Sequence, residues 1–154
     1  SWRRGTNWAF VAVEPGELPA TATAGAYVRA LAGAEPLLAP PAAQRGYEAA
    51  LERWPDDELV LFAAAGQLLG AGSAAPAAAL YRRLLAANPK HTAARNNLAN
   101  ALAARGCYAD ALVEARTALA DSDATGELSG AIRDTVAELE RALVDNRAAA
   151  STCQ

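Results

Sequence analysis

The stretch RNNLANALAARGCYADALVEARTAL, residues 95–119, alternates small and large side chains in an order typical of two helices that meet across a tight turn. Ala99, Ala111 and Ala118 are the small positions, and Leu and Tyr side chains stand between them. A small side chain at a helix crossing lets the two backbones approach, and Gly106 permits the turn between the helices. The stretch therefore predicts a helical hairpin.

The hairpin belongs to a longer repeat. When the sequence is moved along itself by 34 residues, Tyr47 falls on Tyr81 and Pro55 falls on Pro89. An Ala-rich composition does not explain these matches, because Tyr and Pro recur as well as Ala. Further columns of the repeat are Leu51, Leu85 and Leu119, and Ala43, Ala77 and Ala111.

This period and pattern resemble the tetratricopeptide repeat, a family whose unit is a helix, a turn and a second helix in 34 residues. The resemblance implies an all-α fold, a right-handed superhelix of about three units at residues 24–57, 58–91 and 92–125. A single hairpin cannot bury both of its faces, so stacked units must cover one another. We expect the helical repeat domain, with its terminal helix, to span residues 19–147.

The units depart from the family pattern in places. Arg95 stands where the family has its early aromatic residue in the third unit, and Asp123 replaces the terminal proline. The first unit is degenerate, because Pro36, Pro40 and Pro41 interrupt the expected turn between its helices.

Local signals mark the ends of the units. Pro55 and Pro89 cannot continue a helix and end the first and second units. Asp56 and Asp57 precede the apolar run ELVLF, where a carboxylate caps a helix N-terminus and complements its dipole.

A terminal capping helix is expected at residues 126–147, followed by a disordered tail at 148–154. The last hairpin of a stack leaves one apolar side uncovered, and this segment carries an apolar stripe that could cover it. The stripe repeats every three or four residues and consists of Leu128, Ile132, Val136, Leu139 and Leu143.

Residues 1–18 do not fit the repeat and are expected to form an extended arm or a remnant strand of an upstream domain. Residues 8–13, WAFVAV, favour a β-strand that ends at Pro15 and Gly16. Three interpretations stay open: an apolar arm along the first helices, a strand that pairs with a second copy in a homodimer, or the last strand of an upstream domain.

A narrower resemblance covers nearly the whole chain. The order WAFVAVEPGELPATA, then ALERWPDD, then NNLANALAARGCYADAL is similar to the C-terminal part of a family of bacterial cell-envelope cysteine peptidases. Those proteins join a papain-like peptidase domain, of the type that processes bacteriocin leaders, to a short tetratricopeptide tail. The resemblance implies a cell-envelope or periplasmic location and a catalytic domain upstream of Ser1, so no catalytic residue is carried over to this chain.

Composition narrows the function classes. The net charge of −3 and the pI near 5.2 argue against a nucleic-acid partner, which would favour a basic surface. No apolar run approaches the roughly 20 residues that span a bilayer. The sequence contains no Met, so we expect an excised fragment or a mature form of a longer protein.

No catalytic or cofactor-binding constellation is expected. His91 and Cys107 are the one nucleophile and base pair worth testing, but about 14 helical residues would separate them by roughly 20 Å, far beyond hydrogen-bond reach. A disulfide between Cys107 and Cys153 is an open alternative. The sequence has no zinc-ligand spacing, phosphate-binding glycine loop or EF-hand, so we expect a non-enzymatic protein without cofactor or metal.

The predicted function is a protein or peptide interaction module, because first helices of stacked hairpins line a concave face. Asn96, Asn97 and Asn100 share one face of a predicted helix, and Asn can both donate to and accept from a peptide backbone. Local hydrogen bonding is the other interpretation of these residues. In the neighbouring units the face would include Phe62 and Arg29, together with Gly66 and Val28. Two alternative functions stay open, an accessory domain of a cysteine peptidase and a homodimerisation module.

Overall fold

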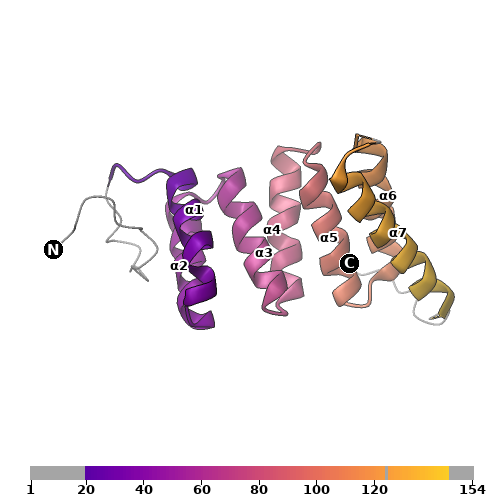
Figure 1. Ribbon diagram of the computed structural model, residues 1–154, viewed down its shortest axis with the longest axis horizontal. Coiled ribbons are helices and arrows are strands. Elements are labelled where there is room, and N and C mark those ends of the chain that lie inside the picture. Colours follow the sequence, from indigo (N-terminus) through magenta and orange to yellow (C-terminus); the bar gives the residue numbers. More distant parts are fainter. Residues whose placement is uncertain (1–19, 124, 146–154) are drawn as a thin grey trace. The chain divides into compact units, whose positions relative to one another are not determined.

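The computed structural model describes residues 20–123 and 125–145, and this part of the chain is all-helical, as predicted. Seven α-helices and one short 3-10 helix follow one another in the described ranges (Figure 1). Their bounds are α1 (Ala24–Ala34), η3 (Glu35–Leu37), α2 (Pro40–Arg53), α3 (Glu58–Gly70), α4 (Ala74–Ala87), α5 (Thr92–Ala104), α6 (Tyr108–Asp121) and α7 (Glu127–Asp145). The expected strand at 8–13 and the expected tail at 148–154 lie outside the described residues.

The helix starts follow the period of the sequence. Helices α1, α3 and α5 begin at residues 24, 58 and 92, and helices α2, α4 and α6 begin at residues 40, 74 and 108. Each of α2, α4 and α6 has 14 residues, and α3 and α5 have 13 residues each, whereas α1 has 11. The 34-residue period found in the side chains is therefore also the period of the secondary structure.

The chain divides into two compact units, one ending at Ala71 and the other beginning at Gly72. The first unit contains α1, η3, α2 and α3, and each of its three α-helices contacts the other two. The second unit contains α4, α5, α6 and α7. Within it, α5 packs against both α4 and α6, and α7 packs against α6 and α5.

A capping aspartate and two glycines mark the starts of α3, α4 and α6. The Asp57 carboxylate accepts hydrogen bonds from the backbone N–H groups of Leu59 and Val60, at 3.0 and 3.1 Å, so Asp57 caps α3 as predicted. Gly72 and Gly106 have φ angles of 81° and 79° at the turns before α4 and α6. Glycine adopts this left-handed conformation without a Cβ clash, which explains its use at both turns.

The prolines of the first unit do more than interrupt a turn. Pro36 lies in η3, and Pro40 is the first residue of α2, where its missing N–H is not needed. The segment that the prolines were expected to interrupt is a short 3-10 helix, followed by α2.

Close contact between α1 and α2 organises the first unit. The buried Tyr27 hydroxyl donates a 3.0 Å hydrogen bond to the Gly46 carbonyl oxygen. A Cβ atom added at Gly46 would lie 2.7 Å from Leu31 Cδ1, so the buried Leu31 side chain would have to shift to accept one. Tyr27 also packs on Trp54, with ring centroids 5.7 Å apart.

Small side chains let α5 and α6 pack closely in the second unit. Ala99 and Ala111 are fully buried, and Leu98 and Leu102 are almost fully buried. Residues 95–119 thus form two helices packed against each other, as their pattern of small and large side chains predicted.

Helix α7 lies where a capping helix was expected. Ile132 and Leu139 are buried and Val136 and Leu143 are half-buried, as their stripe predicted. Leu128 is an exception, because 42% of it is exposed at the start of the helix.

Arg95 joins α5 to α6 through an ion pair with Glu114. Its guanidinium donates hydrogen bonds of 2.8 Å to Glu114 Oε2 and to the Pro89 carbonyl. Tyr27 holds the same repeat position in the first unit of the sequence, and its partner Gly46 matches Glu114. One position therefore joins a first helix to a second helix by two different chemistries.

The contact between Gly46 and Leu31 can be tested by substitution. Gly46→Ala should force an overpacked crossing, which costs about 1–3 kcal/mol, against about 1 kcal/mol gained in helix propensity. Gly33→Ala is the matched control, because nothing lies within 4 Å of its added Cβ. We expect urea unfolding to show Gly46→Ala less stable than Gly33→Ala, and equal stabilities would contradict the close crossing.

A double-mutant cycle tests the Arg95–Glu114 pair. These side chains are 18% and 27% exposed, whereas those of the pair Arg116–Glu140 are 60% and 48% exposed. Substitution by Gln, singly and together, should give a coupling energy of about 1 kcal/mol for the first pair and less for the exposed pair. Unfolding free energies in urea measure both, and a larger coupling for the exposed pair would contradict the proposed role of Arg95.

Candidate peptide-binding surfaces

The first unit contains a groove of about 640 Å³. The end of α1, the 3-10 helix η3, the start of α2 and one face of α3 form its walls. Figure 1 shows α1, α2 and α3 as neighbours. Its volume falls in the range of about 300–1,000 Å³ that is usual for ligand pockets. The lining residues are Ala32, Glu35, Leu38, Pro40, Ala43, Tyr47, Phe62, Ala63, Gly66, Gln67, Gly70 and Ala71.

The wall from α3 is one face of the helix. Phe62, Gly66 and Gly70 follow one another at intervals of four residues, which places them in a row along that face. Gly66 and Gly70 carry no side chain, and a Cβ atom added at Gly70 would meet nothing within 4 Å. Phe62 provides an aromatic surface, and Gln67 adds an amide that can donate and accept.

One carboxylate is held in position at the groove. The Tyr47 hydroxyl donates a 2.9 Å hydrogen bond to Glu35 Oε2, and both residues line the groove. Tyr47 is only 4% exposed, so its ring is fixed in the packing between helices. Burial, with a contribution from the Glu35 carboxylate, raises the pKa of the Tyr47 hydroxyl well above its usual value, so the hydroxyl stays protonated and remains a donor.

The structure separates the residues that the sequence assigned to the concave face of the first and second 34-residue repeats. Phe62 and Gly66 both line the groove. Arg29 is exposed on α1 and Val28 is half-buried, and neither belongs to the lining.

The three Asn residues of α5 have three different environments. Asn96 is only 7% exposed, and its buried Oδ1 has no hydrogen-bond partner in the described part of the chain. Asn97 is half-buried and donates a 3.3 Å hydrogen bond to the Tyr81 hydroxyl, which is the local role left open above. Asn100 is exposed. Asn100 is therefore the most accessible of the three to a partner.

Sequence reasoning missed Glu35, Tyr47 and Gln67 as groove residues. Tyr47 recurs as Tyr81 in the repeat, but this recurrence does not show which residues line a groove. Glu35 stands in the proline-rich segment EPLLAPP. The repeat pattern is broken there, so Glu35 could not be aligned with a position in the other repeats.

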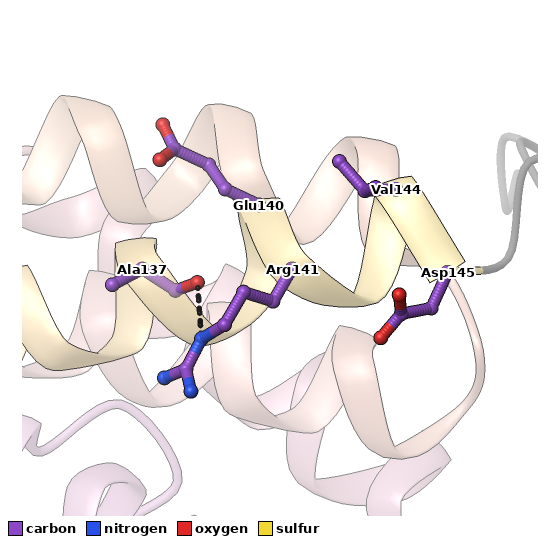
Figure 2. Close-up of a pocket in the computed structure, with 5 residues that line it drawn as sticks. All are labelled: Ala137, Glu140, Arg141, Val144 and Asp145. Atoms are coloured by element: carbon purple, nitrogen blue, oxygen red, sulfur yellow. Dashed lines mark hydrogen bonds between the residues drawn. The ribbon is translucent and has the colours of Figure 1, made fainter.

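A second, shallower depression of about 380 Å³ lies along the end of α7 (Figure 2). Its described lining comes from that one helix: Ala137, Glu140, Arg141, Val144 and Asp145. Arg141 Nε donates a 3.2 Å hydrogen bond to the Ala137 carbonyl within the helix. The depression thus lacks a second wall among the described residues.

His91 and Cys107, the pair considered for catalysis, have other roles in the structure: one caps a helix and the other is disulfide-bonded. His91 Nδ1 accepts a 3.1 Å hydrogen bond from the Ala94 N–H and caps α5. Cys107 is fully buried at the start of α6 and is disulfide-bonded, and Cys153, the other cysteine of the sequence, lies outside the described residues.

Two further searches concern the described residues alone. In residues 20–123 and 125–145, no group of three His, Cys, Asp or Glu side chains is arranged to hold a metal ion. No helix in the same part of the chain has both the length and the apolar character needed to cross a membrane.

Comparison with known proteins adds no assignment: no family model matches the sequence, and no curated protein matches it.

The buried tyrosines predict a loss of stability in alkali. Burial raises the pKa of Tyr27, Tyr47 and Tyr81, so the folded chain keeps three protons that the unfolded chain releases above about pH 10. Because the unfolded state then binds fewer protons, the free energy of unfolding should fall as pH rises above 10, by up to about 1.4 kcal/mol per pH unit for each tyrosine.

Urea unfolding between pH 8 and pH 11 measures this loss. Lys90 is the one lysine of the sequence, so few other side chains titrate in this range. Tyr27→Phe should make the decline shallower, and an equal decline in that variant would contradict the assignment.

Proposed function

We propose that this chain is a tetratricopeptide-like helical repeat protein that binds an extended peptide and is not itself an enzyme. The observation that carries the proposal is the groove of the first unit, whose long wall is one face of α3. Helix starts at 34-residue intervals support the repeat, since that interval is the unit length of the family.

The position of α3 within its unit supports binding on this face. In stacked helical hairpins the first helix of each unit lines the concave surface. Helix α3 begins at residue 58, where the second 34-residue repeat of the sequence begins. It is therefore the first helix of that repeat. An extended peptide needs apolar contact and backbone hydrogen bonds, which Phe62 and Gln67 can provide in the groove.

The groove's chemistry argues against an anionic ligand. Among the described residues, its lining includes no Lys, Arg or His, and Glu35 is its one charged residue. Nucleic acids and acidic peptide ends are bound mainly through basic side chains. A neutral, apolar or basic peptide is the ligand class that remains.

The two other functions predicted from the sequence, an accessory peptidase domain and a dimerisation module, depend on an upstream domain or on residues 8–13. Both lie outside the described residues, so these functions stay as predictions.

Selection from a displayed library of random peptides tests the proposal. We expect peptides that bind the full chain and lose at least about tenfold in affinity, about 1.4 kcal/mol, when Gly66→Trp fills the groove. Gly33→Trp is the matched control, because Gly33 is also an exposed helical glycine but does not line the groove.

Circular dichroism and urea unfolding establish that both variants are folded. Peptides that bind both variants equally would contradict groove binding. If such peptides lost affinity on Asn100→Ala instead, the binding face would be the one predicted on α5.

A further inference from the structure

The electrostatics of the groove distinguish one kind of peptide from the others. Glu35 is half-buried and is the one charged residue among the described residues of the lining. No salt bridge joins it to another described residue, whereas Glu114 pairs with Arg95 and Glu140 pairs with Arg116. Glu35 is thus a charge at the groove without a counter-charge from the described chain.

The carboxylate is also oriented. Tyr47 holds Glu35 Oε2 at 2.9 Å, and Oε1 has no hydrogen-bond partner in residues 20–123 and 125–145. A carboxylate accepts about four hydrogen bonds, so Oε1 and the free lone pair of Oε2 are available to a donor. The Tyr47 ring is packed between helices, so the Glu35 side chain that it holds has little conformational freedom left to lose when a ligand binds.

A ligand that fills the groove removes water from this carboxylate. Removing water from a charge without a compensating partner is costly, and a second negative charge would add repulsion. A cation supplied by the ligand offsets that cost through a charge-assisted hydrogen bond.

On the basis of the function proposed above, we propose that the groove selects peptides with a basic side chain, Arg or Lys, next to apolar residues, and that Glu35 is the residue that binds this cation. Tyr47 acts as a positioning residue, because it holds the carboxylate and has no charge of its own to offer. The flanking apolar side chains of the peptide occupy the space along Phe62, Gly66 and Gly70.

The test repeats the peptide-library selection against three full-length proteins: the unsubstituted chain, Glu35→Gln and Glu52→Gln. Gln at position 35 can still accept from Tyr47, so the fold is kept while the charge is removed. Glu52 is the matched control, because it is an exposed Glu of α2 outside the groove lining. Library peptides sensitive to Gly66→Trp are then synthesised with blocked termini and measured by calorimetry.

We expect basic residues to be enriched among peptides selected by the unsubstituted chain and by Glu52→Gln, and not by Glu35→Gln. Replacing the basic residue of a peptide by Gln should weaken binding at least about tenfold, or about 1.4 kcal/mol, and less than about threefold against Glu35→Gln. Higher salt should reduce the preference, because it screens the ion pair. Arg and Lys versions of one peptide distinguish a guanidinium site from an ammonium site.

Each other outcome overturns the inference in its own way. Groove-dependent peptides without basic enrichment would remove the role of Glu35 and leave the proposed peptide binding in place. A basic preference that survives Glu35→Gln would assign the cation to another carboxylate. Selection of no groove-dependent peptide would remove the inference and the proposed function together.

Discussion

Close approach of helix backbones is the constraint on which the rest of the structure depends. At the crossing of α1 and α2, a methyl group at Gly46 would displace the buried Leu31 side chain, which packs directly against the glycine. Between α5 and α6 the same purpose is served by fully buried alanines such as Ala99 and Ala111. Small side chains thus fix the spacing of the helices, and large ones fill the gaps that this spacing leaves.

Polar contacts between the helices add to this packing, and their chemistry differs from one hairpin to the next. Tyr27 reaches a backbone carbonyl of α2 from inside the first unit, and Arg95 reaches a carboxylate of α6 from the corresponding position. Both contacts join residues 19 positions apart. A repeat position can therefore keep its geometric role while its chemistry changes from an aromatic hydroxyl to an ion pair.

Much of the fold could be predicted from the sequence because the signals are local and periodic. The recurrence of Tyr47 and Pro55 at Tyr81 and Pro89 placed the helices, and Asp57 marked the start of α3. The first hairpin was harder, since consecutive prolines were interpreted as interruptions, whereas Pro40 in fact begins a helix.

The candidate site could be predicted only in part, because it depends on contacts between residues distant in sequence. Periodicity identified Phe62 and Gly66, which share a face of α3. It could not show that Glu35 meets Tyr47, since that pairing requires the course of the segment between α1 and α2. Nor could helical spacing show that Asn96 is buried and Asn100 exposed, because the neighbouring helices decide which part of a face is covered.

The short first helix has a consequence for how such a protein can change. Helix α1 has 11 residues where α3 and α5 have 13, yet α2 still begins 34 residues before α4. The residues that leave the helix are redistributed into the connecting segment that carries Glu35, so total length is conserved. Variation in this segment can thus diversify recognition while every downstream element keeps its place in the chain, which makes the connector a natural location for retargeting by evolution or by engineering.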